Sequence, residues 1–236
     1  MEEVFSVEGL RVTVGGAAAS GIAAAALLAS RGALVTLSDA RSEVAGVEGL
    51  GALGVRLELG TNREETFSGA DLVVLSPGVP PERPFVEAAR RAGVPVIGEI
   101  ELASRWLRGR IVAITGTKGK STTTTLVGRI LREAGLPATV AGNLRAPPAA
   151  QVEGSAPPTI PDVAVSSFQL ETTATFRPWI AAITNLSADH LDRHATFQEY
   201  ASAKAKVFAN QGEGDWVVAN ADDTPAMNLA TRHAKA

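Results

Sequence analysis

The sequence of 236 residues contains no cysteine, which excludes disulfides, thiolate metal sites and cysteine nucleophiles. It has no marked excess of one charge, because 22 Lys and Arg stand against 25 Asp and Glu. A net charge of −3 gives no general attraction to nucleic acid or to an anionic membrane. The longest Ala-rich apolar stretch, residues 21–30, is too short to span a bilayer, and the acidic N-terminus lacks a signal-peptide pattern. We therefore expect a cytoplasmic monomer with no nucleic-acid or membrane partner.

One stretch has the pattern of a phosphate-binding loop. An apolar run at residues 111–114 leads into Thr115-Gly116-Thr117-Lys118-Gly119-Lys120-Ser121-Thr122, and a helix is predicted over residues 121–134. Two glycines let backbone N–H groups converge at a helix start, where Lys120 can reach terminal phosphates and Ser121 can hold Mg²⁺. The usual loop has four residues between its glycines and this one has two, so we interpret it as a shorter relative. The alternative is an ordinary glycine turn.

The first 97 residues predict a Rossmann-like domain. A strand at 10–14, a glycine-containing turn, a helix ending near Ser30 and a strand at 34–38 ending at Asp39 have the order of a dinucleotide-binding unit. An aspartate at the end of the second strand suits a ribose hydroxyl. Further strands are predicted at 55–59, 71–75 and 94–97, with a turn at Ser76-Pro77-Gly78 and a helix at 83–92. Residues 1–40 alone leave a nicotinamide dehydrogenase, another nucleotide binder and a plain helix start open.

Residues 98–236 repeat the alternation of strands and helices. Strands are predicted at 111–114, 138–140, 162–166, 179–184 and 215–219, a helix at 196–209, and an irregular surface segment at 146–161. The fold class is therefore α/β, a Rossmann-like domain followed by a P-loop-type ATPase domain, with mostly parallel sheets. Asp189, His190, Asp192 and His194 follow a buried strand, where functional loops of such sheets lie. Lys204, taken alone, could be a surface lysine.

Several motifs in one order resemble the Mur ligase family of peptidoglycan synthesis. They are the phosphate loop, Gly142-Asn143, Ser166-Ser167-Phe168-Gln169-Leu170-Glu171, Asn185-Leu186, Asp189-His190-Leu191-Asp192-Arg193-His194, Tyr200 with Ala203-Lys204, and Asn220-Ala221-Asp222-Asp223. The Ser-Ser-Phe-Gln-Leu-Glu string and the early Ser-Pro-Gly are most similar to the branch that adds D-glutamate. This resemblance implies an ATP- and Mg²⁺-dependent ligase that joins D-glutamate to UDP-N-acetylmuramoyl-L-alanine through an acyl phosphate.

The resemblance also implies roles for individual residues. The catalytic residues that it implies are Lys120, Asn143, His190 and Lys204. The metal ligands that it implies are Ser121, His190 and Lys204, and Lys204 would carry CO₂ as a carbamate. Nucleotide binding falls to Gly116, Thr117, Lys118, Gly119, Lys120, Ser121 and Thr122. The residues that it implies bind the UDP-linked substrate are Ser20, Gly21, Asp39, Arg41, Ser76 and Gly78, together with Asn143 and His190. These roles displace the dehydrogenase interpretation of the first turn.

The chain departs from the family pattern at three positions. Lys118 stands where the family has Asn, Arg145 where it has Gly, and Ala164 where it has a metal-binding Glu, so we expect weaker metal binding. The family's third domain is also missing, and we expect these residues alone to bind the UDP-linked substrate better than ATP and not to ligate. Alternatives are a non-catalytic UDP-sugar-binding fragment or degenerate ligase, and a folylpolyglutamate synthase, which the Ser-Ser-Phe-Gln-Leu-Glu string disfavours.

Overall fold

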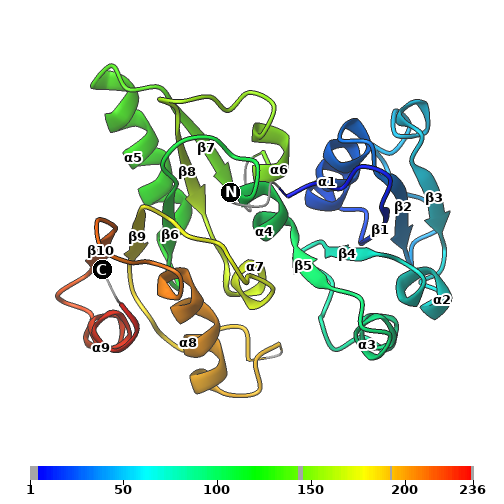
Figure 1. Ribbon diagram of the computed structural model, residues 1–236. Helices are drawn as coiled ribbons and strands as arrows, with labels where there is room; N and C mark the ends of the chain where they lie inside the picture. The colour runs from blue at the N-terminus through cyan, green and yellow to red at the C-terminus, as the bar shows by residue number, and fades with distance from the viewer. Residues whose placement is uncertain (1–4, 143–145, 192, 235–236) are drawn as a thin grey trace. The chain divides into compact units, whose positions relative to one another are not determined.

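The computed structural model describes residues 5–142, 146–191 and 193–234, and it forms two compact units (Figure 1). The first unit ends at Arg105 and the second begins at Trp106. The sequence predicts a boundary near residue 98, but helix α4 (Glu99–Ser104) belongs with the first unit because it packs against helix α1 (Ala19–Ser30). Within the described ranges, no helix is both long and apolar enough to cross a membrane.

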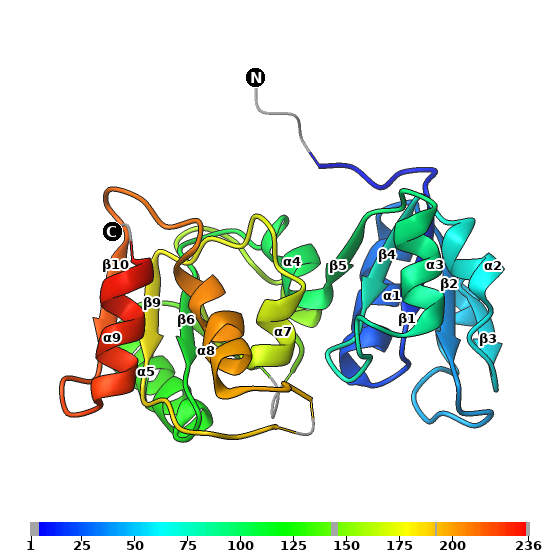
Figure 2. The same ribbon diagram turned by 90° about the horizontal axis from the view of Figure 1, so that it is seen from below.

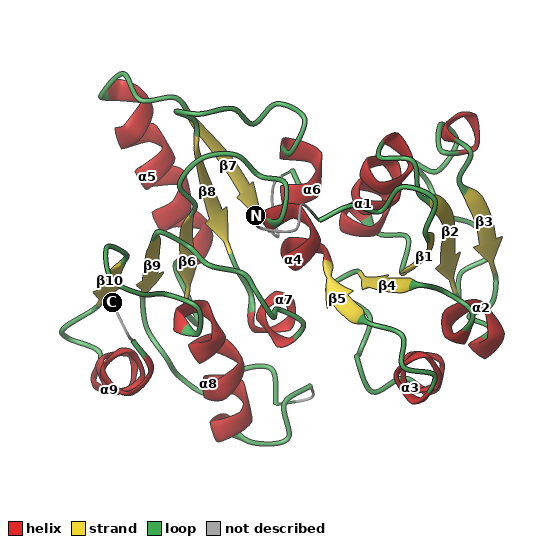
Figure 3. Ribbon diagram, viewed as in Figure 1, coloured by secondary structure: helices red, strands yellow, loops and turns green. Residues whose placement is uncertain are grey.

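The first unit is built on a five-stranded parallel sheet with the order β3-β2-β1-β4-β5. Its strands, yellow in Figure 3, are β1 (Arg11–Gly15), β2 (Leu34–Asp39), β3 (Arg56–Leu59), β4 (Leu72–Leu75) and β5 (Val96–Gly98). Its other helices are α2 (Glu64–Ser68), α3 (Pro84–Arg91) and the 3₁₀ turn η1 (Gly51–Leu53).

The chain reverses its direction of travel across this sheet between β3 and β4. Because parallel crossovers are right-handed, the reversal puts α1 on one face and α2 and α3 on the other. The second face is closed by an apolar cluster that includes Phe67, Val73, Leu75 and Val86. Loops after β1 and β4 consequently leave toward opposite faces, and the crevice between them is where open α/β sheets bind ligands.

The second unit has a parallel sheet with the order β10-β9-β6-β8-β7. Its strands are β6 (Val112–Thr115), β7 (Ala138–Gly142), β8 (Ile160–Ala164), β9 (Ile180–Ile183) and β10 (Trp216–Ala219). Its helices are α5 (Lys120–Glu133), α6 (Pro148–Gln151), α7 (Ser167–Glu171), α8 (Phe197–Ala205), α9 (Thr224–His233) and the 3₁₀ turn η2 (Lys206–Phe208).

The chain reverses its direction of travel across the second sheet at the edge strand β7. The crossover from β6 to β7 through α5 runs one way, and those from β8 to β9 and from β9 to β10 run the other way. Right-handed crossovers therefore place α7 and α8 on the face opposite α5, and these two helices pack together (Figure 2). The carboxyl end of β6, with β8 and β9 as its neighbours, is thus the ligand edge of this sheet.

The α/β class and the parallel sheets are confirmed, and most predicted elements lie within two residues of their observed bounds. The prediction that residues 146–161 are irregular is wrong in part, because α6 lies within them and β8 begins at Ile160. Pro148 starts α6, where its missing N–H is not needed. Pro161 is tolerated in β8 because at that level the strand pairs only with β7. Helices α2, α4 and α7 were not expected, since none exceeds six residues.

Candidate functional site

The loop between β6 and α5 requires its two glycines. Gly116 has φ 141° and Gly119 has φ 83°, backbone conformations that L side chains rarely adopt. A Cβ on Gly116 would also collide with Thr184 Oγ1. The first turn of α5 carries no acidic residue, so the positive end of this helix is available to an anion.

Asn185, just after β9, fastens this loop. Its Oδ1 accepts a hydrogen bond from the Lys118 N–H at 2.9 Å, and its Nδ2 donates to the Lys118 carbonyl at 2.9 Å. Its own carbonyl accepts from the Thr117 N–H at 2.9 Å. Asn185 therefore positions the phosphate loop. The sequence alone identifies it only as part of the Asn185-Leu186 motif.

Lys120 and Lys204 converge on one backbone carbonyl of the loop. Lys120 Nζ donates to the Gly116 carbonyl at 2.9 Å and Lys204 Nζ donates to the same oxygen at 2.8 Å. Lys204 is 1% exposed, and burial, with a smaller contribution from the Lys120 charge, lowers its pKa to about 7. Burial also lowers the pKa of Lys120, and Asp189 partly offsets the effect on both amines. Two amines beside one carbonyl make this edge receptive to an anion.

The Thr117 side chain faces the protein rather than a ligand. Its Oγ1 accepts from the Ser187 N–H at 3.0 Å and from the Tyr200 hydroxyl at 3.1 Å, and it donates to the Ser187 carbonyl. The Tyr200 ring in turn lies 4.6 Å from Lys204 Nζ. Thr117 and Tyr200 therefore tie the loop to α8, which holds Lys204 in place.

His190 lies beside these groups on the loop after β9. It has φ 53°, unusual for a residue other than glycine, and its side chain is 45% exposed. Its ring is 4.9 Å from that of Phe168 and 6.3 Å from that of Tyr200. The Asp189 carboxylate accepts a hydrogen bond from the His190 N–H at 2.9 Å. The imidazole thus reaches solvent next to the loop.

The Ser-Ser-Phe-Gln-Leu-Glu string forms the start and body of α7 and supports the His190 loop. Ser166 and Gln169 form a capping box at the helix start. Glu171 pairs with Arg193 at 2.8 Å and lies 3.4 Å from His194 Nδ1, while His194 Nε2 is 3.0 Å from Ser167 Oγ. Burial lowers the pKa of His194. The contacts of these residues account for the presence of the motif, because they fix the position of the His190 loop and do not point toward a ligand.

The predicted metal ligands form a sparse set. Ser121 and Thr122 lie in the first turn of α5, with Ser121 half-buried and Thr122 exposed. No group of three or more His, Cys, Asp or Glu suited to a metal ion occurs in the part of the chain that the structure describes. Ala164 ends β8 and supplies no oxygen. The predicted role of Asn143 falls outside the described residues.

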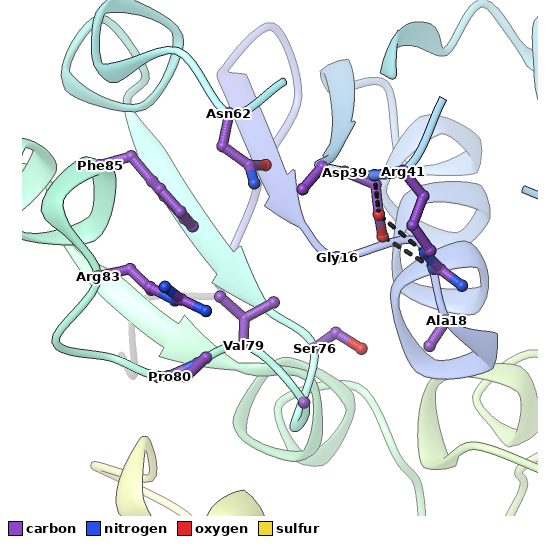
Figure 4. A pocket seen from close by; sticks show the side chains of 12 residues that line it. Gly16, Ala18, Asp39, Arg41, Asn62, Ser76, Val79, Pro80, Arg83 and Phe85 are labelled. Atoms are coloured by element: carbon purple, nitrogen blue, oxygen red, sulfur yellow. Dashed lines mark hydrogen bonds and ion pairs between the residues drawn. The ribbon is translucent and has the colours of Figure 1, made fainter. Parts of the chain in front are cut away.

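A pocket of about 460 Å³ opens at the carboxyl edge of the first sheet (Figure 4). It is lined from three neighbouring strand ends, by Gly16 and Ala18 after β1, Asp39 to Arg41 after β2, and Ser76, Gly78, Val79, Pro80, Arg83 and Phe85 after β4, with Asn62 beside them. Four residues predicted to bind the UDP-linked substrate meet here, namely Asp39, Arg41, Ser76 and Gly78. Ser20 and Gly21 do not line the pocket; Gly21 instead lies against the Gly16 carbonyl.

Asp39 braces the pocket. Its Oδ2 accepts from the Ala17 N–H at 2.7 Å and from Arg41 Nη2 at 2.9 Å, and its Oδ1 accepts from the Arg41 N–H and Nε. The Arg41 side chain is the main cause that lowers the Asp39 pKa to about 2. Both oxygens are thus engaged, although the sequence pattern had suggested a ribose contact. Ser76 Oγ is buried and has no hydrogen-bond partner among the described residues.

Comparisons with known proteins match both units to domains of one family. The Mur ligase middle domain matches residues 114–236, and the Mur ligase MurD-like N-terminal domain matches residues 10–98. The UDP-N-acetylmuramoylalanine–D-glutamate ligase of Koribacter versatilis is 47% identical over 97% of this chain and 51% of its own length. The ligase of the same name from Anaeromyxobacter dehalogenans is 49% identical over 95% and 49%. The chain spans about half the length of these relatives.

Solved structures support the fold. The UDP-N-acetylmuramate:L-alanyl-γ-D-glutamyl-meso-diaminopimelate ligase of Neisseria meningitides superposes with a TM-score of 0.66 at 18% identity, over 96% of this chain and 76% of that one. The UDP-N-acetylmuramate-alanine ligase of Thermotoga maritima has a TM-score of 0.59 at 24% identity, over 93% and 51%. The two domain matches, together with the phosphate loop and its paired lysines, lead to one conclusion: the chain belongs to the Mur ligase family.

Proposed function

We propose that this chain is the substrate- and nucleotide-binding part of an ATP-dependent ligase of peptidoglycan synthesis. The first unit binds UDP-N-acetylmuramoyl-L-alanine, the second binds ATP, and the complete enzyme adds D-glutamate. The observation that carries the proposal is the loop at residues 115–122 with Lys120 and Lys204 at one carbonyl. The names of the relatives support the choice of substrates.

The chemistry requires two anions to approach each other. The substrate carboxylate attacks the γ-phosphate of ATP, which breaks the bond to the β–γ bridging oxygen, releases ADP and forms an acyl phosphate. The amine of D-glutamate then attacks the acyl carbon, loses a proton and displaces inorganic phosphate to form the amide. Lys120, turned back onto the Gly116 carbonyl, is close enough to swing toward terminal phosphates and neutralise charge as it moves. The N–H groups at the start of α5 hold the phosphates, and His190 faces the reacting groups from the next strand end.

Mg²⁺ is usually held by one or two carboxylates plus phosphate oxygens. Because the described residues include no group of acidic side chains suited to a metal ion, Mg²⁺ fits this site only as a partner of the bound phosphates. Ser121 Oγ and His190 would hold it, and it would neutralise phosphate charge. Lys204 as an ammonium would repel it. A pKa near 7 leaves a neutral fraction of the amine, which is the form that can take up CO₂ and become an anionic ligand.

A second candidate function is non-catalytic binding of a UDP-sugar. Ala164 favours it, because the family position that supplies a metal-binding carboxylate is here a methyl group. In either case we propose a cytoplasmic monomer that binds neither nucleic acid nor membrane, which the balanced charge and the lack of cysteine support.

Calorimetric titration of the chain with ATP–Mg²⁺ and, separately, with UDP-N-acetylmuramoyl-L-alanine separates these functions. Binding of both ligands, with ATP lost in Lys120→Met and retained in the control Arg129→Gln on the exposed side of α5, supports the ligase. Binding of the UDP-linked ligand alone supports the non-catalytic binder. Binding of neither refutes both. Incorporation of D-glutamate by this chain alone, at a rate typical of an enzyme, would contradict our expectation that these residues do not suffice.

A further inference from the structure

Arg83 is the residue before α3 and lines the pocket of the first unit (Figure 4). The pocket has three charged lining residues, Asp39, Arg41 and Arg83. Asp39 and Arg41 neutralise each other through a bidentate pair. The Arg83 side chain has no hydrogen bond or ion pair with any residue that the structure describes, and Arg83 is exposed. The net positive charge of the pocket therefore comes from Arg83.

The position of Arg83 indicates which part of a ligand it meets. Arg41 lies on the β2 side of the pocket and Arg83 on the β4 side, with the β1–α1 turn between them. Helix α1 has twelve residues, no acidic residue in its first turn and no side-chain cap, so its positive end faces this turn. An extended ligand that crosses the three strand ends would pass its anionic centre over α1 and toward Arg83.

Ser76 supplies an independent sign of a ligand. Its Oγ is 2% exposed, lines the same pocket between the β1 turn and Arg83, and has no hydrogen-bond partner among the described residues. Buried hydroxyl groups are normally paired, so this one is available to an oxygen of a bound molecule. A guanidinium with a free donor fork and a hydroxyl donor together match phosphate oxygens better than a neutral heterocycle.

We propose that Arg83 binds the diphosphate of a nucleoside-diphosphate-linked ligand and sets the preference of the pocket for a diphosphate over a monophosphate. This inference rests on the proposed function of the first unit. It adds a residue that neither the motifs nor the family roles single out. Arg41, in contrast, acts through Asp39 on the shape of the pocket.

The test measures the binding of UDP, UMP and uridine to the full chain and to three variants. Arg83→Gln removes the charge, Arg83→Lys keeps it, and Arg91→Gln removes an equal charge from the other end of α3, away from the pocket lining. We expect Arg83→Gln to weaken UDP roughly 5- to 20-fold, with less than about a twofold change for uridine. Arg83→Lys should recover most of the loss, and Arg91→Gln should bind as the parent does.

Other outcomes overturn the proposal in distinguishable ways. Unchanged UDP binding in Arg83→Gln, or an equal loss for UDP and uridine, refutes a diphosphate contact. An equal loss in Arg91→Gln assigns the effect to the general field of the unit. If the parent chain binds neither UDP nor UMP, the UDP-linked substrate of the proposed function fails as well. Circular dichroism of each variant establishes that it is folded, as expected for an exposed side chain.

Discussion

Replacing Asp162 with Val should stabilise the second unit, and more strongly at alkaline pH. Asp162 lies in β8, a strand paired on both sides, with its side chain toward Gly128 of α5. It is fully buried, and neither carboxylate oxygen has a hydrogen-bond partner among the described residues. Burial raises its pKa from 3.8 to about 7, and the Arg132 charge and the nearby Gly128 N–H, which does not meet hydrogen-bond geometry, offset only part of this.

The magnitude follows from the pKa. A rise from 3.8 to about 7 amounts to ~4 kcal/mol, since each pKa unit is about 1.4 kcal/mol. The folded state holds the proton more tightly than the unfolded chain does, so this destabilisation is absent below pH ~4, grows as the pH rises, and is complete above pH ~7. We expect Asp162→Val to raise the free energy of unfolding by roughly 2–4 kcal/mol at pH 8 and by less than about half of that at pH 5.

The assay is urea denaturation at pH 5 and pH 8, followed by tryptophan fluorescence. Trp106, Trp179 and Trp216 are the three tryptophans of the sequence, and all lie in the second unit, so the signal reports its unfolding. Asp162→Asn is the control: it should lose the pH dependence but gain less stability, because its amide remains buried without a partner. An equal gain for Asp162→Val at both pH values, or a loss at pH 8, would refute the reasoning.

Three further predictions concern the two ligand edges. Asn185→Ala should weaken ATP binding roughly tenfold and leave UDP binding unchanged, because the Lys118 backbone loses two hydrogen bonds; parallel calorimetric titrations measure both. Gly116→Ala should lower the free energy of unfolding by roughly 1–3 kcal/mol and abolish ATP binding, because of its φ and the collision with Thr184; thermal unfolding with and without ATP tests this. Arg41→Ala should slightly destabilise the first unit at pH 7, because the Asp39 carboxylate loses its ion pair with an exposed guanidinium. Because the Asp39 pKa is lowered to about 2, that difference should shrink as the pH falls from about 4 toward 2, and acid titration of both proteins monitored by circular dichroism measures it.

The sequence by itself determined the fold class and the place of the phosphate loop. Apolar β-branched runs such as residues 111–114 predict strands, and the glycines that follow predict a turn with unusual φ values. Both signals are local, so they can be recognised without knowledge of the tertiary contacts. The order of the motifs also sufficed to place the chain in its family. Short elements such as α7 stayed hidden, because a helix of five residues carries too few periodic positions.

Only the tertiary structure decided which side chains face a ligand. Lys204 could have been a surface lysine, and it is buried because α8 packs beneath a loop 88 residues earlier in the chain. Asp39 had the right place for a ribose contact, yet the fold brings Ala17 and Arg41 onto both of its oxygens. Arg83 carries no motif, and it gains its significance because β4 lies beside β1 in the sheet. Hydrogen-bond partners and burial come from strand order, a long-range property that no local pattern encodes.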